Sequence, residues 1–359
     1  MKPDLLYLTP FPGLRQAGQH CADYLARHVR EDGSFEYEIY ARTGRTTAKY
    51  NILRHAGAIY AFSRWMNLQN CIEKGEITER KVAGGKVADI MELPVAFLLG
   101  HTKPLEEAGN TYCIVEGDEV KLGGTALALL ALVERYKLYP RKQDRKWMVR
   151  LAEFIVWMQD PGGKFYSKFF YREKTFSDFE STYYPGEAIL SLLRLYQMDP
   201  DPRWLQAAVS GSEYLLKHPV LDLTGARGHN HWFVIALSEL MAVVPREDFY
   251  TEFQLIVDST IQIFRQEMTA PASSASVATF GEAMVAALLQ PHRERPDELF
   301  TLTKDILRYC LGLQVIGQPD FIDHAKGGIM ESHTNDRIRI DFVQHTLQVI
   351  SGFLLAQDG

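Results

Sequence analysis

Two kinds of helical pattern alternate along the chain. One kind is amphipathic, with apolar residues on one side and charges on the other, as in residues 145–159, 203–218, 248–266 and 297–313. Residues 14–30 and 85–100 supply two more helices of this kind. The second kind is apolar on almost every side after a polar or glycine-containing entry, in residues 51–62, 122–132, 184–195, 229–240, 280–289 and 340–353.

This alternation predicts an all-α fold. A helix that is apolar all round must be buried, and an amphipathic helix can cover it. Six such pairs indicate an (α/α)6 toroid, with six inner helices wrapped by six outer helices in a single domain over residues 1–359. A superhelical solenoid of helix pairs is the alternative, although solenoid repeats are usually more regular in length.

Two smaller features interrupt the helices. Residues 111–124, "TYCIVEGDEVKLGG", predict a small β-hairpin that turns at "EGDE". Short glycine loops, "EDGSF" at 31–35, "DPGGKFY" at 160–166 and "KGGIM" at 326–330, predict tight chain reversals.

Aligning the six inner helices on their apolar bodies brings polar residues to one shared position. These residues are His55, Thr125, Glu187, His231, Glu282 and His345. We expect them to face a central funnel near the N-termini of the inner helices. The alternative is structural, because an acidic residue in a first turn is favoured by the helix dipole even on a surface, and a single histidine is often a hydrogen-bonded packing residue.

Composition narrows the class of protein. Hydrophobic residues make up 46% and charged residues 23%, as in soluble globular proteins with a large core. A net charge of −6 without a basic run argues against nucleic acid and anionic membrane surfaces. No apolar stretch reaches the length of a membrane span, so membrane insertion is not expected.

The cysteines and the N-terminus bear on location. Four cysteines lie far apart without a C-x-x-C pair, which favours free thiols in a reducing compartment. The first residues contain no apolar core of signal-peptide length, so we expect a cytoplasmic protein, unless the chain is an excised domain or the mature form of a secreted one.

No cofactor or metal is expected for the activity. His229 and His231 in "GHNHW" have a spacing that occurs in metal sites, but no motif supplies a third ligand.

Three segments resemble carbohydrate-active toroids: "FESTYYPGEAILSLLRLY" (179–196), "GHNHWFVIAL" (228–237) and "IDFVQHTLQVISGF" (340–353). The similar families are the N-acylglucosamine 2-epimerase group, the unsaturated glucuronyl hydrolases and the toroidal domain of glucuronyl epimerases. In the 2-epimerase group, funnel histidines act as acid and base, and His231 and His345 are similar in placement. No family's complete catalytic signature is present. Prenyltransferase subunits and terpenoid cyclases share the toroid, but the D-x-D-D motif of the cyclases is absent.

The leading hypothesis is therefore an enzyme that acts on a sugar or uronic acid. Glu187 and Glu282 are the expected acid/base pair, as in glycoside hydrolysis or epimerisation, and His231 and His345 share proton transfer. The expected partner is a small-molecule or oligosaccharide substrate, and nothing indicates an oligomeric state. Residues expected to bind the substrate are Arg54, His55, Tyr184, His229, Trp232 and Asp341. A non-catalytic toroid that binds a glycan or small ligand and an isoprenoid-handling toroid are the alternatives.

Overall fold

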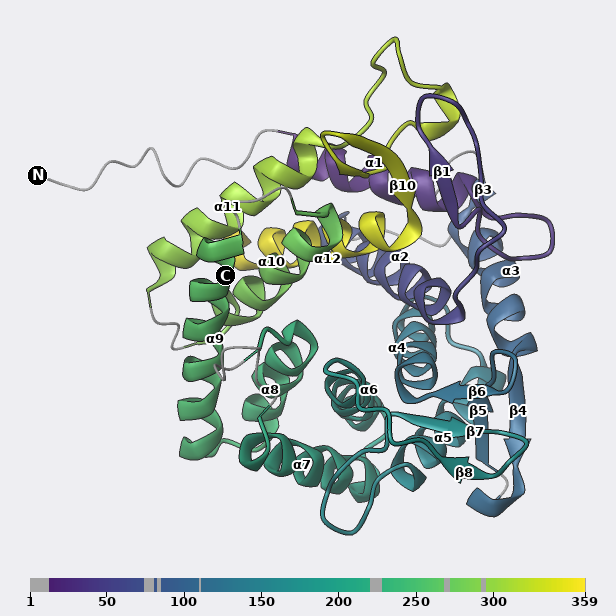
Figure 1. Cartoon of the computed structure of the whole chain (residues 1–359), viewed down its shortest axis with the longest axis vertical. Helices are drawn as coiled ribbons and strands as arrows, with labels where there is room; N and C mark the ends of the chain where they lie inside the picture. The colour runs from purple at the N-terminus through teal and green to yellow at the C-terminus, as the bar shows by residue number, and fades with distance from the viewer. Residues whose placement is uncertain are drawn as a thin grey trace, which may run out of the picture.

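Twelve α-helices alternate between an inner and an outer ring in the computed structural model (Figure 1). The structure describes residues 13–73, 81–82, 85–109, 111–219, 228–267, 272–291 and 295–358. The inner helices are α2 (Ile52–Glu73), α4 (Leu122–Leu138), α6 (Tyr184–Met198), α8 (His231–Val243), α10 (Ser274–Leu288) and α12 (Ile340–Asp358). The outer helices are α1 (Leu14–Arg27), α3 (Val87–Gly100), α5 (Lys142–Trp157), α7 (Pro202–Lys217), α9 (Glu247–Glu267) and α11 (Pro296–Gly312).

The inner helices form a closed ring. Each contacts the next in chain order, and α12 returns to pack against both α1 and α2 (Figure 1). A solenoid would leave its first and last repeats apart, so this contact excludes it. The predicted (α/α)6 toroid is confirmed.

Burial separates the two rings as the hydrophobic pattern predicts. In α4, every residue from Leu122 to Arg135 is buried, so no side of the first four turns faces solvent. In α7, buried residues recur at helical spacing along one stripe, at Trp204, Ala207, Ala208, Gly211, Ser212 and Leu215. The inner helices therefore form the core, and the outer helices cover it with one face.

Short strands lie in the segments that connect the helices. The pairs are β1 (Glu38–Tyr40) with β10 (Asn335–Arg339), which also pairs with β9 (Met330–Ser332), and β2 (Lys81–Val82) with β3 (Gly85–Lys86). In the other two sheets, β4 (Thr102–Leu105) pairs with β5 (Thr111–Ile114), and β7 (Lys168–Phe170) lies between β6 (Glu119–Lys121) and β8 (Thr175–Phe176). Two 3₁₀ turns, η3 (Glu106–Ala108) and η4 (Asp323–Ala325), complete the described elements.

The predicted hairpin over 111–124 is only partly correct. The chain does turn at "EGDE", where Glu116 and Glu119 form a single bridge. The strands on either side, however, pair with other partners, since β5 pairs with β4 and β6 pairs with β7. Residues beyond Lys121 already belong to α4, which leaves β6 too short for an independent hairpin.

The three glycine loops have the same conformation and packing. Gly33, Gly163 and Gly327 have φ angles of +86°, +94° and +87°, which L side chains rarely adopt. A Cβ on any of the three would lie within 2.4 Å of a backbone oxygen in a neighbouring outer helix, in α3, α7 and α1 respectively. Glycine is therefore required both for the turn and for close packing on the next outer helix.

All four cysteines are free, as expected. In the described part of the chain, no helix combines the length and apolar character needed to cross a membrane.

Candidate active site

Two histidines and one glutamate from three inner helices meet inside the ring. His231, Glu282 and His345 come from α8, α10 and α12, and one nitrogen or oxygen atom of each lies within 4.8 Å of the others. The ring centroids of His231 and His345 are 5.6 Å apart, with the rings nearly perpendicular. The structure thus brings together three of the four predicted catalytic residues.

His231 is a buried and neutral imidazole. It is the first residue of α8, a position fixed by the Asn230 side chain, which accepts a hydrogen bond from the Phe233 amide and donates one to the Thr182 carbonyl. Neither ring nitrogen of His231 has a hydrogen-bond partner within the described residues. Burial lowers its pKa well below the usual value, and the charges of His345 and His229 lower it further. A neutral imidazole with a free lone pair can accept a proton.

His345 has the opposite environment. Its Nδ1 lies 2.6 Å from Glu282 Oε1, so it donates a hydrogen bond to the carboxylate. Burial alone would lower the pKa of His345, but the charge and hydrogen bond of Glu282, with the charge of Asp341, raise it. Because Nδ1 is engaged, Nε2 is the nitrogen left to meet a substrate. The pair can therefore act as a proton donor near neutral pH.

The alignment predicted that Glu282 lies near the N-terminus of its helix, and the structure places it further along. The helix α10 begins at Ser274, about two turns before Glu282, and Ser273 caps it by accepting a hydrogen bond from the Ser276 amide. The carboxylate therefore lies deeper in the ring than the first-turn position of Glu187. Its depth lets it reach His345, which is itself well inside α12.

Arg54 and Asp341 form a fixed ion pair beside this cluster. Arg54 donates from Nε to Asp341 Oδ2 at 2.8 Å and from Nη1 to the Tyr37 hydroxyl at 2.6 Å. Arg339 donates to both oxygens of Asp341, at 2.5 and 2.8 Å. Burial would raise the pKa of Asp341, but the Arg339 hydrogen bond and the charges of both arginines lower it. Arg54 also opposes protonation of His345, which places its charge within reach of the cluster.

Glu187 lies apart from the cluster, against α4. A Cβ on Gly123 would be 2.1 Å from Glu187 Oε2 and 2.4 Å from Tyr184 Cδ1, so both side chains cover the α-carbon of this glycine. Glu187 is buried, and its Oε2 has no hydrogen-bond partner in the described ranges. Burial raises its pKa to about 8, and burial also raises that of Tyr184, to about 12, with help from the Glu187 charge. Glu187 is therefore an isolated acid, protonated at neutral pH, and not the partner of Glu282.

Two of the predicted substrate-binding residues, His55 and Trp232, lie in the packed interior. His55 is fully buried, and its ring bonds to the Tyr50 hydroxyl at 2.7 Å and the Pro94 carbonyl of α3 at 2.8 Å. Trp232 is 3% exposed and packs near Tyr60, so it offers almost no surface to a ligand.

His229 is likewise engaged in packing. It bonds through Nε2 to Thr279 Oγ1 at 3.1 Å and stacks on Phe280. Thr279 donates its hydroxyl to the Ser276 carbonyl, so His229 must be the donor, and burial lowers its pKa to about 3. His229 therefore supports the cluster from behind, at a ring distance of 5.7 Å from His231.

The sequence analysis did not identify the residues that hold Arg54 and Asp341 in place, or the glutamate that caps α2. Tyr37 and Arg339 come from segments without a helical pattern, although "RIRID" places Arg339 next to Asp341 in an alternating β stretch. Glu116 accepts a hydrogen bond from the Ile52 amide at the start of α2 and binds Lys121 at 2.9 Å. The "EGDE" turn thus caps an inner helix, a role that the turn motif alone does not reveal.

A large cavity inside the ring reaches Glu282 but not the two histidines. It has a volume of about 920 Å³ and is lined by residues of five inner helices, among them Arg64, Gln197, Ile235 and Gln348, with Glu282 in its wall. His231 and His345 do not line it. Glu282 therefore lies between the histidine pair and this mostly apolar space, whose lining includes residues at the C-terminal ends of α8 and α10.

The cluster of His231, Glu282 and His345 also has the composition of a metal site. A metal ion there would have to replace the hydrogen bond between His345 and Glu282, whose side chains are only 14% and 3% exposed and have little room to separate around an ion. The ion pair as it stands suits proton transfer better than metal ligation.

No protein-family model and no curated protein sequence matches this chain. Solved structures do share its fold. A D-mannose isomerase superposes with a TM-score of 0.69 at 10% identity, covering 100% of both chains. The cellobiose 2-epimerase from Bacillus thermoamylovorans B4167 gives 0.65 at 12% identity over 94% of this chain and 98% of the other. An unsaturated glucuronyl hydrolase specific for heparin gives 0.65 at 10% identity over 96% and 98%. The resemblance to carbohydrate-active toroids is confirmed at the level of the fold.

Proposed function

We propose that the chain is a carbohydrate-active enzyme that moves a proton at a sugar carbon next to a carbonyl group. The observation that carries this proposal is the pair His231 and His345, two imidazoles that meet inside the ring in opposite electrostatic environments. A neutral base and a protonated acid are the two groups that enolisation of a sugar requires. The toroidal isomerase and epimerases of similar fold support the same class of reaction.

The geometry favours aldose–ketose isomerisation over epimerisation. One nitrogen of His231 and one of His345 lie within 4.8 Å of each other, so a sugar bound at the pair would meet both from the same side. Isomerisation moves a proton between adjacent carbons on one face, whereas epimerisation needs an acid and a base on opposite faces.

In the proposed step, His231 removes the proton from C2 of an open-chain aldose. The C–H electrons form the C1=C2 double bond, and the carbonyl electrons move to O1, which takes a proton from His345. His345 then removes the O2 proton, the C2 carbonyl forms, and His231 returns its proton to C1. Atoms and charge balance, and no other reactant is needed.

Arg54 is the proposed substrate-orienting group. Two of its five N–H donors are used by Asp341 and Tyr37 within the described residues, which fixes the guanidinium plane. Its side chain is one-third exposed, at 33%, so the remaining donors can bind a sugar oxygen. Tyr183, whose ring lies 5.4 Å from His231, offers an aromatic face to the same substrate.

Glycoside hydrolysis is the second candidate, because Glu187 is a protonated buried acid. Protonation of a leaving-group oxygen is the task of such an acid. The proposal ranks lower because Glu187 is covered by α4 and has no opposing carboxylate in the described cluster.

The test is deuterium exchange. Mannose, fructose, cellobiose and uronic acids are incubated with the chain in D₂O, and NMR follows loss of the C1 or C2 proton. We expect aldose–ketose conversion, with deuterium entering C1 to the extent that the proton on His231 exchanges with solvent before its return, and a decrease in rate of ~10²–10⁴-fold in His231→Asn and His345→Asn. His101→Asn is the control, because this histidine bonds to the Phe97 carbonyl of α3, outside the cluster.

The other outcomes separate the alternatives. A C2-epimer as the product would assign epimerisation. Release of a reducing end, abolished by Glu187→Gln and retained in His231→Asn, would assign hydrolysis. Saturable binding of a sugar without any exchange would make the chain a non-catalytic binding toroid.

A further inference from the structure

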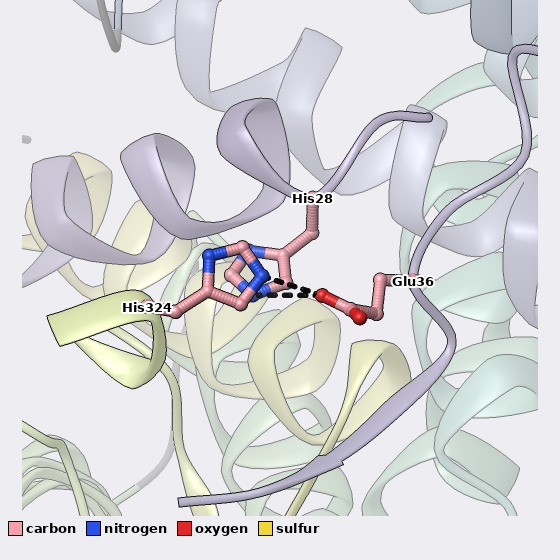
Figure 2. A group of neighbouring side chains, drawn as sticks. All are labelled: His28, Glu36 and His324. Carbon is pink, nitrogen blue, oxygen red and sulfur yellow. Dashed lines mark hydrogen bonds and ion pairs between the residues drawn. The ribbon is translucent and has the colours of Figure 1, made fainter. Parts of the chain in front are cut away.

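A second group of side chains that could bind a metal lies among segments of the outer ring and shares no residue with the histidine pair. His28 follows the end of α1, Glu36 follows the first glycine loop, and His324 is in η4 (Figure 2). Glu36 Oε2 lies 2.5 Å from His324 Nε2 and 3.7 Å from His28 Nε2. The two imidazole rings are 4.1 Å apart, and the ligand atoms all lie within 4.8 Å of one another.

His28 is oriented toward the other two residues. Its Nδ1 donates a hydrogen bond to the Tyr24 carbonyl at 2.8 Å, which leaves the lone pair on Nε2. The side chain has no exposed surface, and Nε2 has no hydrogen-bond partner in the described part of the chain. Nε2 faces the Glu36 carboxylate and His324 (Figure 2). A backbone hydrogen bond to the second ring nitrogen is the usual way in which proteins orient a histidine that binds a metal.

The backbone holds all three ligands in place. The Glu36 amide donates to the His28 carbonyl at 2.7 Å, which closes the glycine loop between them. The Ile322 amide donates to the Ala41 carbonyl at 2.9 Å and anchors η4 beside that loop. Arg27 donates to the Lys326 carbonyl from the other side. Of the three side chains, His324 is the most exposed, at 48%, and has the most room to move.

We propose that His28, Glu36 and His324 bind a divalent transition-metal ion, with zinc as the first candidate. Two imidazoles and one carboxylate are ligands that zinc prefers, and a water completes the tetrahedron. Ligand atoms around a tetrahedral zinc are separated by roughly 3.3 Å, given bonds of about 2.0–2.1 Å. The His324–Glu36 pair at 2.5 Å must open and the His28–Glu36 pair at 3.7 Å must close, each by less than about 1 Å. The exposed His324 can move outward to open the first pair, and a small rotation of the Glu36 side chain, which is 19% exposed, can close the second.

Such an ion would join the first and last repeats of the ring. His28 and Glu36 belong to the first outer helix and its loop, whereas His324 is 288 residues beyond Glu36. The metal would therefore stabilise the closure of the toroid, and this role is independent of any sugar chemistry. The sequence did not reveal the site because no short spacing links its ligands.

Zinc titration of the full chain tests the proposal. The protein is treated with EDTA, desalted and titrated with ZnCl₂ by calorimetry, with Mg²⁺ as a hard-ion control. We expect one equivalent of Zn²⁺ to bind, and the melting temperature to rise by a few degrees as zinc exceeds its dissociation constant. With Co²⁺ in place of zinc, visible absorption should report a site of low coordination number.

Variants locate the ion. His324→Ala and Glu36→Gln should weaken zinc binding at least 100-fold and remove the thermal shift, while His333→Ala, an exposed histidine nearby, should change neither. His324→Gln repeats the test should the alanine variant fold poorly. Lack of stoichiometric binding to the parent chain would overturn the proposal. So would binding that His345→Ala abolishes and His324→Ala leaves intact, since the ion would then lie in the histidine pair.

Discussion

Glu187→Gln should remove one contribution to the pH dependence of folding stability, so that the variant gains stability relative to the parent as the pH rises from 5 to 8. Burial raises the pKa of Glu187 from 4.5 to about 8 in the folded protein, whereas the unfolded chain keeps the ordinary value. The folded state therefore retains a proton that the unfolded chain releases over this range. The stabilisation from this proton is complete below pH 4.5 and is lost as the pH rises through 8.

The magnitude follows from the two pKa values. A tenfold change in a protonation equilibrium corresponds to about 1.4 kcal/mol, so the complete loss is on the order of 5 kcal/mol. Between pH 5 and pH 8 the Glu187 contribution to the free energy of unfolding should fall by about 3 kcal/mol, which corresponds to a difference on the order of 5 °C in melting temperature between parent and variant. Glutamine keeps the shape of the side chain and cannot ionise, so this decrease should vanish in the variant.

The assay is thermal and urea unfolding of both proteins at a series of pH values. Glu247→Gln is the control, because Glu247 is also in the first turn of a helix but is exposed. The parent and Glu187→Gln should be similarly stable near pH 5 and diverge toward pH 8, with the variant more stable. Parallel curves over the whole range would refute the argument and show that Glu187 is ionised in the folded protein.

Three further outcomes are expected. Gly123→Ala should lower the free energy of unfolding in urea by about 1–3 kcal/mol, because the added methyl group would overlap Glu187 Oε2. Gly124→Ala is the control and should change little, because the atom nearest to its methyl group would be 4.0 Å away. Glu282→Gln should lower the pKa of His345, which NMR of the imidazole can measure. Activity should then be lost at a lower pH than in the parent, because His345 gives up its proton earlier. An unchanged pKa of His345 would contradict the pairing with Glu282. Arg194→Met should cost about 3 kcal/mol, since it removes the guanidinium that Glu134 and Glu239 share and leaves Glu134 with Lys137 and Asn67. A loss below about 1 kcal/mol would show that these ion pairs contribute little.

The sequence predicted the helices well because burial imposes a period on them. All twelve helices follow from the alternation of all-apolar and one-sided patterns, and the structure arranges them in the predicted toroid. The hairpin prediction was partly wrong because strand pairing depends on segments far along the chain. The strand β6 finds its partner in β7, which no local pattern around 111–124 could indicate.

The candidate site was predicted in part. Aligning the inner helices on their apolar segments predicts how far along its helix a residue lies, but not the direction in which its side chain points. Successive residues of a helix point about 100° apart, so a shift of one position changes that direction completely. His55 and Arg54 show the effect, because the aligned histidine points toward α3 while the arginine before it reaches Asp341. For Glu282 the position along the helix was predicted incorrectly, because α10 begins at Ser274 and Glu282 lies about two turns further along. Its side chain nevertheless points to His345.

The contact of α12 with α1 and α2 also has a consequence for how the chain folds. The Arg54–Asp341 pair joins residues 287 positions apart, and the strands β1 and β10 pair across the same seam. Contacts of such high sequence separation carry a large loop-closure entropy and form late. During synthesis, the surface of α2 that packs on α12 stays exposed until α12 has been made. A nascent chain therefore exposes part of its hydrophobic core until its last segment has left the ribosome. Because His345 lies on α12, the histidine pair can assemble only once the ring is complete, and a truncated chain should aggregate rather than retain partial activity.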